Sequence, residues 1–172
     1  MQKKGWPVVD SADIQRFNGL PIDELRSRLL RCVAVPRWAN TVADRRPYAD
    51  LAELLSTADE LTAGLADDEV LLALADHPKI GQRTNSAWSR TEQSGVDDRD
   101  ADLAQRLRDG NIAYEARFGH IYLVCATGRG GADMLADLTT RLANDPPTEI
   151  GVVRVELGKI AALRLRRVAE GE

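Results

Sequence analysis

Apolar residues recur at three- and four-residue steps along most of the chain, which is the spacing of one face of an α-helix. The longest of these stripes lie in the segments 22–33, 51–61, 70–74, 103–118, 134–142 and 150–168. A shorter stripe, Trp38 with Val42, ends before Pro47. No repeat or linker interrupts the pattern. We therefore predict an all-α fold, a single-domain bundle of about seven or eight helices over residues 1–172.

Residues that begin and end helices agree with these stripes. Gly119 suits the left-handed position after the helix 103–118, whereas Gly110 is a weak point inside that helix. Asp67 or Asp68 can cap the helix that carries Val70 to Leu74. The turn before the last helix, Asn144 to Pro147, provides a further cap.

One run departs from the helical pattern. Residues 120–127 are rich in Ile, Tyr and Val, which favour extended backbone. A single strand has no partner elsewhere in this sequence. We therefore predict a buried extended segment here, or at most a lone short strand.

Length and charge exclude several classes of protein. The chain has 172 residues and a net charge of −4, with 23 basic and 27 acidic residues mixed along it. Such a balance favours a soluble protein and argues against a nucleic-acid partner, which selects clustered positive charge. No apolar run reaches the ~20 residues that span a bilayer, so we expect no membrane association.

The terminal residues and the two cysteines suggest the cellular compartment of the protein. The first residues lack the apolar core of a signal peptide, and the last four carry no peroxisomal address. Cys32 and Cys125 match no metal-binding spacing, and we expect both to be buried thiols in a reducing cytoplasm. Residues 1–14 are expected to be a loosely attached segment before a domain over 15–168.

His77 is a polar residue where an apolar one is due. Val70 and Leu74 set a stripe whose next position is residue 77 or 78. Carbonyl groups at the end of that helix favour a protonated imidazole, and Pro78 stiffens the chain beyond it. His77 is therefore either an acid–base group in a cleft or a core histidine bonded to a backbone carbonyl.

Three polar residues on one predicted helix face, and one arginine on an apolar stripe, are further candidates for a binding site. Ser89, Glu92 and Gln93 fall on one face of a short predicted helix and suit a ligand rich in N–H and C=O groups, or else form a solvated surface. Arg164 interrupts the last apolar stripe, so it needs an anion, either a bound one or a protein carboxylate such as Glu156. His120 is expected to pack rather than react.

Five motifs in order resemble one known family. Ala75-Asp76-His77-Pro78-Lys79-Ile80-Gly81 and Ser89-x-x-Glu92-Gln93-x-Gly95 resemble its two central signatures. The flanking motifs are Trp38-Ala39 with Arg46-Pro47-Tyr48, Asn111-x-x-Tyr114-x-x-Arg117-Phe118-Gly119 with Val124-Cys125-Ala126, and Glu156-x-x-Lys159-Ile160-x-x-x-Arg164-Leu165. From about Phe17 to Val168 the chain is similar to 2-oxo-4-hydroxy-4-carboxy-5-ureidoimidazoline (OHCU) decarboxylases. His120 stands where many members carry an aromatic residue.

The resemblance implies an activity and a set of roles. It implies an all-helical carboxy-lyase, usually a homodimer, that converts the small molecule OHCU to (S)-allantoin in urate breakdown with no metal and no organic cofactor. His77 would then be the general acid–base and Glu92 its partner. The implied substrate contacts are Pro78, Ser89, Gln93, Arg164 and main-chain groups near His120 and Ile121.

Two other functions are compatible with the same residues. One is a cofactor-free hydrolase or lyase acting on a related ureido compound. The other is a non-catalytic helical interaction module, in which His77, Glu92 and Arg164 would lie far apart. Convergence of these three side chains on one pocket would favour an enzyme.

Overall fold

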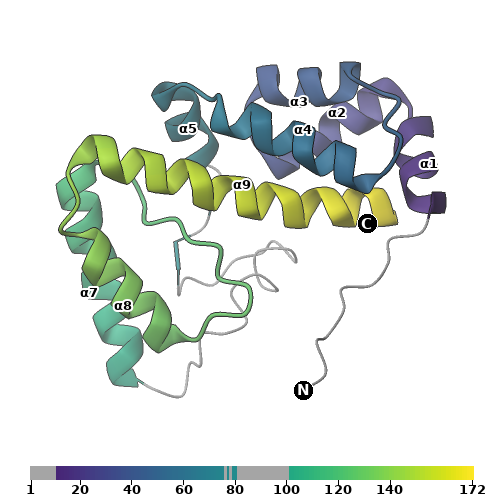
Figure 1. Cartoon of the computed structure of the whole chain (residues 1–172). Coiled ribbons are helices and arrows are strands. Elements are labelled where there is room, and N and C mark those ends of the chain that lie inside the picture. The colour runs from purple at the N-terminus through teal and green to yellow at the C-terminus, as the bar shows by residue number, and fades with distance from the viewer. Residues whose placement is uncertain (1–10, 76, 78, 81–100) are drawn as a thin grey trace. The chain divides into compact units, whose positions relative to one another are not determined.

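The computed structural model (Figure 1) describes residues 11–75, 77, 79, 80 and 101–172. These residues form eight α-helices and no strand, which confirms the predicted all-α fold. The helices are α1 (Ser11–Gly19), α2 (Ile22–Cys32), α3 (Pro36–Asp44), α4 (Leu51–Ala63), α5 (Asp67–Leu74), α7 (Ala101–Phe118), α8 (Gly131–Arg141) and α9 (Pro146–Glu170).

The chain divides into two compact units. One comprises the described residues up to Leu61 together with Ala161–Glu172, and the other comprises Thr62–Ile160. Helix α9 is continuous and contributes its N-terminal part to the second unit and its C-terminal part to the first. The single-domain organisation stays a prediction.

Large apolar side chains form the core of the first unit, where α2, α3 and α4 gather around the C-terminal part of α9 (Figure 1). Leu25, Leu29 and Leu54 are fully buried. The indole N–H of the buried Trp38 donates to Ala58 O at 3.3 Å, so its polar atom is satisfied inside the core. The predicted stripe of α2 is wrong at its first position, because Ile22 is 37% exposed.

Helix α1 is an element that the apolar pattern did not predict. It begins at Ser11, within the segment expected to be loosely attached. It buries Ile14 and Phe17, and the guanidinium of Arg16 donates to Ala169 O at 3.1 Å. These contacts attach α1 to the C-terminal part of α9.

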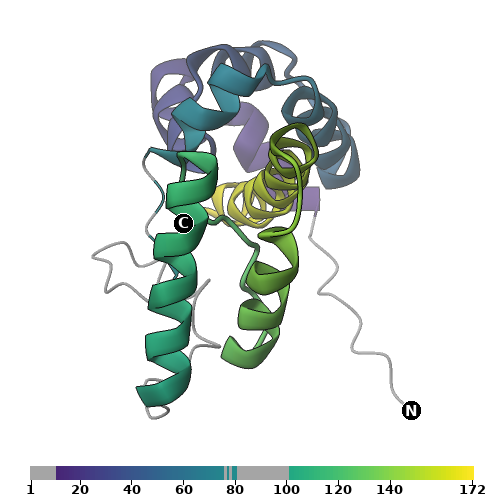
Figure 2. The same ribbon diagram turned by 90° about the vertical axis from the view of Figure 1, so that its left-hand side faces the viewer.

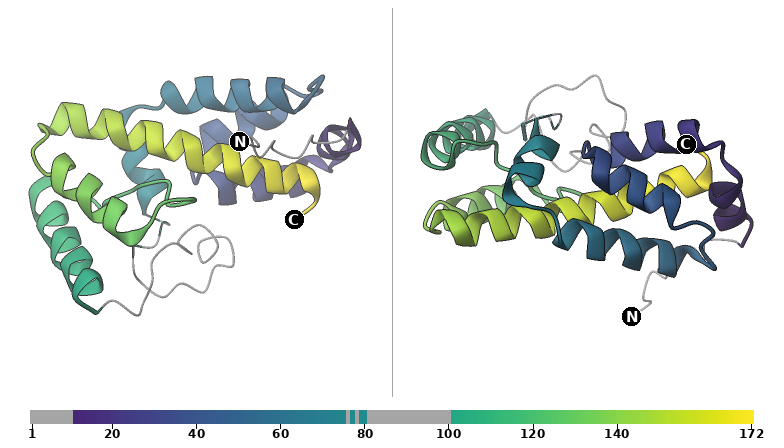
Figure 3. Two further views of the ribbon diagram at one scale, coloured as in Figure 1. Left: turned by 60° about the horizontal axis from the view of Figure 1, so that its bottom comes forward. Right: turned by 90° about the horizontal axis from the view of Figure 1, so that it is seen from above.

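Helices α7 and α8 lie side by side in the second unit, as Figure 2 and the left view of Figure 3 show. Helix α7 continues through Gly110, where a weak point was expected. A Cβ atom at position 110 would come within 2.5 Å of Leu138 Cδ2, so the glycine allows α7 to approach α8 closely. Tyr114, Tyr122 and Met134 are among the residues that fill the core between them.

Two of the predicted helix ends agree with the structure and one does not. Gly119 has φ +76, the left-handed conformation expected after α7, and Asp145 caps α9 by accepting from Thr148 N at 2.8 Å. At the start of α5, however, the N-cap is Ala66, whose N–H donates to the Glu69 carboxylate. Asp67 is instead the first helical residue, and its carboxylate pairs with Arg154 on α9 at 2.5 Å.

Residues 121–126, which the sequence predicted to be extended and which are called the extended segment below, belong to neither a helix nor a strand in the described residues. Tyr122 and Val124 point into the α7–α8 core. Side chains, not another strand, satisfy part of its main chain: Arg141 donates to Leu123 O at 2.8 Å, and Cys125 N donates to Glu156 at 2.8 Å. Polar main chain that is buried without a partner is costly, so these two bonds are needed to hold the segment.

Candidate active site

His77 lies three residues beyond the end of α5, and its ring turns back onto that helix. Its Nδ1 lies 2.8 Å from Ala73 O, and its backbone N–H donates to Leu74 O at 3.0 Å. The side chain is half-buried. Both oxygens belong to the last turn of α5, where carbonyl groups have no partner within the helix.

The bond to Ala73 determines which nitrogen of His77 carries the proton. A carbonyl oxygen can only accept, so Nδ1 must be the donor. In the neutral ring Nε2 then holds the lone pair and can act as a base, and after protonation the same atom can act as an acid. The bond to a backbone carbonyl that the sequence offered as one alternative is therefore present. It is compatible with an acid–base role for His77, which stays a prediction.

Helix α7 holds the chain immediately after His77. The ammonium group of Lys79 lies 2.6 Å and 2.8 Å from the two carboxylate oxygens of Glu115. The amide of Asn111 donates to Ile80 O at 3.3 Å and to Leu107 O at 2.9 Å, and Asn111 is 5% exposed. Residues 79 and 80 are thus attached to one face of α7.

His120 packs among aromatic rings, as expected. Its ring lies 5.5 Å from that of Tyr114, edge to face, and 6.0 Å from that of Phe118, stacked. Its Nδ1 lies 3.1 Å from Ile121 O, which again makes Nδ1 the donor. The half-buried Ile121 begins the extended segment. The substrate contacts expected near His120 and Ile121 stay a prediction.

A buried polar network of Arg141, Glu149 and Tyr114 supports residues 121–126, because Arg141 donates to Leu123 O. Arg141 donates to the Glu149 carboxylate at 2.6 Å through Nη2 and at 2.8 Å through Nε, and the Tyr114 hydroxyl donates to the same carboxylate. Burial would lower the pKa of Arg141, but hydrogen bonding to Glu149 raises it. Burial, with help from the hydrogen bond to Glu149, raises the pKa of Tyr114. Arg141 therefore stays charged and Tyr114 stays neutral.

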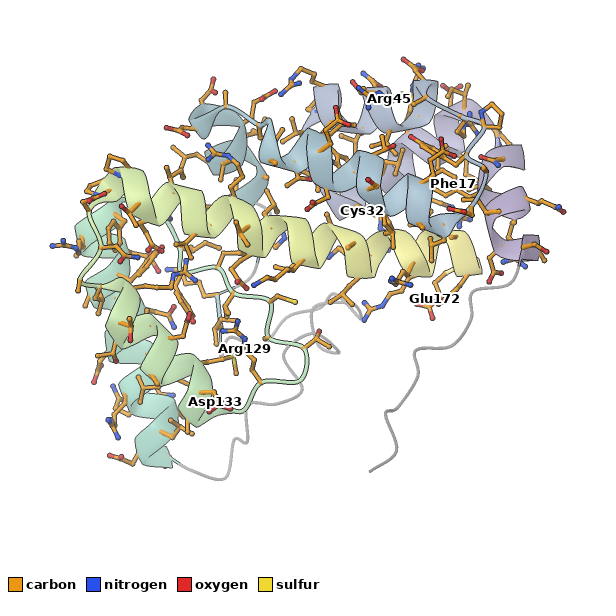
Figure 4. The ribbon with its side chains drawn as sticks, in the orientation of Figure 1. Phe17, Cys32, Arg45, Arg129, Asp133 and Glu172 are labelled. Carbon is orange, nitrogen blue, oxygen red and sulfur yellow. The ribbon has the colours of Figure 1, made fainter. Side chains whose placement is uncertain are left out.

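A second buried carboxylate, Glu156, holds the far end of the segment. Besides Cys125 N, it accepts from Lys159 at 2.5 Å. Arg129, labelled in Figure 4 just before α8, lies 3.9 Å from Glu156 and 3.7 Å from Asp137. Glu156 is the acid that the sequence offered as a partner for Arg164. These contacts show that it binds the extended segment and Lys159.

Arg164 is buried in the first unit with 7% of its surface exposed. Its Nη1 donates to Arg31 O at 3.2 Å and to Cys32 O at 3.5 Å, the last carbonyl groups of α2. Cationic side chains are favoured there by the helix dipole. The role of Arg164 as a substrate contact stays a prediction.

Four of the predicted site residues lie outside the described part of the chain: Pro78, Ser89, Glu92 and Gln93. His77 belongs to the second unit and Arg164 to the first. The convergence of His77, Glu92 and Arg164 on one pocket therefore stays a prediction.

Two other kinds of functional feature are absent from the described residues. These residues contain no group of three or more His, Cys, Asp or Glu side chains that could hold a metal ion. None of their helices is long and apolar enough to cross a membrane.

Some residues that shape the site were not singled out from the sequence, although a signal was present. Asn111 interrupts the stripe between Leu107 and Tyr114, and Arg141 follows Leu138 by one helical turn. A polar residue on an apolar stripe is the same signal that identified His77. The main-chain atoms that they hold, Ile80 O and Leu123 O, lie 31 and 18 residues away, so the sequence does not reveal these contacts.

Comparison with known proteins identifies the class and then the family. The family profile described as OHCU decarboxylase matches residues 18–166. The OHCU decarboxylase of Amia calva is 29% identical over 168 residues, with 92% of this chain and 95% of that protein covered. The uric acid degradation bifunctional protein of Arabidopsis thaliana is 35% identical over 145 residues, which cover 80% of this chain and 45% of that protein. This chain thus spans less than half of the bifunctional relative.

A solved structure agrees with the sequence comparisons. A crystal structure of an OHCU decarboxylase in the presence of (S)-allantoin superimposes with a TM-score of 0.71 at 27% identity, covering 82% of this chain and 96% of that one. The fold and the relatives define an all-α carboxy-lyase. The chain belongs to the OHCU decarboxylase family.

Proposed function

We propose that this chain decarboxylates OHCU to (S)-allantoin in urate degradation, as a cytoplasmic homodimer that needs no cofactor. The observation that carries the proposal is the match of the family profile to residues 18–166. The geometry of His77 supports it, because the Nδ1 bond to Ala73 O leaves Nε2 as the atom that exchanges protons.

The substrate explains why no organic cofactor is required. The carbon that loses its carboxylate also carries a hydroxyl and adjoins a ring C=N bond. When the bond to the carboxylate breaks, CO₂ leaves and the electron pair moves towards the C=N nitrogen, so the substrate is its own electron sink. The hydroxyl then becomes a carbonyl and the ureido-bearing carbon gains a proton. The net reaction consumes one proton and releases one CO₂.

The roles follow from this chemistry. His77 removes the hydroxyl proton or delivers the proton to carbon, within the ~10²–10⁴-fold typical of a placed acid or base. Glu92 holds the hydroxyl or directs the carboxylate out of the ring plane. Arg164 binds ring or ureido oxygens through its planar fork, and Ser89 and Gln93 bind the amide groups. Protonation from one face would give a single enantiomer.

The test uses urate that has been treated with urate oxidase and hydroxyisourate hydrolase, so that OHCU forms in the cuvette. We expect the protein to accelerate the appearance of one-handed allantoin, followed by circular dichroism. Spontaneous rate and racemic product with the folded protein present would overturn the proposal. His77→Ala should lose at least about 10²-fold in rate. The matched control is Arg106→Ala, an exposed residue of α7.

A further inference from the structure

Asn111 and Glu115 lie one turn apart on α7, and both bind the chain that follows His77. Asn111 donates to Ile80 O, and Glu115 binds Lys79. Residues four apart on a helix share a face, so the two contacts act on adjacent residues from one rigid surface. On its other side His77 is tied to the last turn of α5 through Ala73 O and Leu74 O.

We propose that Asn111 is a positioning residue for His77, with Glu115 as its helper. The inference rests on the proposed function, in which His77 exchanges protons with the substrate. His77 is anchored to α5, and Lys79 and Ile80 are anchored to α7. Releasing the α7 end frees the chain to move, and the ring then no longer has to keep its bond to Ala73 O.

Asn111 lies in the core, and its hydrogen bond to Ile80 O reaches beyond its own helix. It is 5% exposed, and Ile80, whose carbonyl it binds, is 6% exposed and belongs to the same core cluster as Tyr114 and Tyr122. Asn111 therefore fixes the main chain of Ile80 while the side chain of Ile80 is held between α7 and α8. A displacement of about 1 Å in a catalytic group can cost ~10²-fold in rate, so an anchor of this kind matters for catalysis.

The variant Asn111→Leu tests the proposal, because it removes the donor at nearly constant size. Gln105→Leu is the matched control, since it makes a similar change at an exposed position of α7. Glu115→Gln is a milder second variant on the partly exposed surface, which keeps an acceptor for Lys79 and loses the charge. It keeps the test decisive if Asn111→Leu fails to fold.

Two measurements are made on each variant. The first is the long-range ¹⁵N–¹H spectrum of the imidazoles, which reports the tautomer. The chain has only two histidines, so His120 serves as an internal reference and His77→Ala assigns the signals. The second is kcat and KM for fresh OHCU.

In the wild type we expect the Nδ1–H tautomer at both histidines. In Asn111→Leu, the His77 signals should move towards a mixture of tautomers while those of His120 stay in place, and kcat should fall at least 10-fold with KM changed less than about 3-fold. Glu115→Gln should show the same change to a smaller extent, and Gln105→Leu should show none.

Other outcomes overturn the proposal. A variant with wild-type kcat and a wild-type His77 spectrum excludes positioning, and so does a change in only one of the two readouts. If the wild type itself does not act on OHCU, the proposed function is wrong, and the imidazole spectrum still decides whether Asn111 orients His77.

Discussion

Gly110 of α7 faces Leu138 of α8 so closely that a Cβ atom at position 110 would come within 2.5 Å of Leu138 Cδ2 and 3.3 Å of its Cγ. Leu138 is fully buried, so it cannot move aside without disturbing the core. A residue that the sequence marked as a helix weakness is therefore a contact point between two helices.

The first prediction compares two helical glycines. Gly110→Ala should be less stable than Gly151→Ala by about 1–3 kcal/mol, the usual cost of overpacking a core. A Cβ atom added to Gly151 on α9 would meet nothing within 4 Å beyond its own helix, so its replacement should gain ~0.5–1 kcal/mol from helix propensity alone. Because both variants gain the same propensity, urea unfolding isolates the steric effect. Equal stabilities would contradict the close approach.

The second prediction concerns the buried pair of Arg141 and Glu149, whose side chains are 5% and 0% exposed. Glu149→Leu should lower the free energy of unfolding by about 3–5 kcal/mol, because it leaves a buried guanidinium without its anion. Asp44→Leu breaks an exposed ion pair with Arg26 and should cost less than about 1 kcal/mol. Similar midpoints in guanidinium chloride for both variants would show that the pair is not shielded from water.

The third prediction is a dependence on alkaline pH. All three tyrosines have raised pKa values: burial raises that of Tyr48 to about 12 and, with acceptors Glu149 and Asp137, raises those of Tyr114 and Tyr122 further. The folded state thus holds these protons more tightly than the unfolded chain, whose tyrosines titrate at 10.0. Their contribution to stability is present below pH 10 and is lost as the pH rises towards the folded values.

The check is absorbance at 295 nm, which follows tyrosinate. The native protein should show little tyrosinate at pH 10, where an unfolded chain would be about half ionised. Above that pH the signal should rise together with loss of helical circular dichroism. Ionisation of two or more tyrosines near pH 10 in a protein that keeps its helices would refute the prediction.

The fourth prediction separates the two roles of Arg164. Arg164→Lys keeps the charge but removes the guanidinium Nη1 that donates to Arg31 O and Cys32 O, and should cost about 1–2 kcal/mol of stability. If Arg164 also binds substrate, kcat/KM for OHCU should fall at least 10-fold at a temperature where the variant is fully folded. Arg106→Lys, at an exposed position, is the control. Lower stability with unchanged kcat/KM would show that Arg164 caps α2 and does not bind substrate.

Much of the fold follows from apolar spacing, and its failures have physical causes. The stripes of α7, α8 and α9, and that of α2 beyond Ile22, agree with buried or half-buried residues, because each of these helices is long enough to show a period. Helix α1 has only Ile14 and Phe17 on its buried face, too few for a pattern. The cap of α5 was misassigned because a glutamate reaches back to the N–H of Ala66, a contact that the identity of Ala66 does not suggest.

The site could be predicted only in part. His77 and Arg164 stand out because they are polar on apolar stripes, and both proved partly or fully buried. Their partners were not predictable, because Ala73 O, Arg31 O and Cys32 O are main-chain atoms whose availability depends on where helices end. Asn111 and Glu149 bind groups 31 and 35 residues away, so only the folded chain identifies them as partners.

The extended segment 121–126 is bound by its own helices much as a groove binds a foreign peptide. Paired strands in a sheet share one register, so a shift at one residue pair moves all the other pairs of the two strands. Here Arg141 of α8 holds the peptide group of Leu123, and Glu156 of α9 holds that of Cys125, so the main chain is bound at separate points by side chains of two helices. Removing one of these bonds therefore acts first on a single peptide group, whereas a change in a strand acts on every residue that is paired along it.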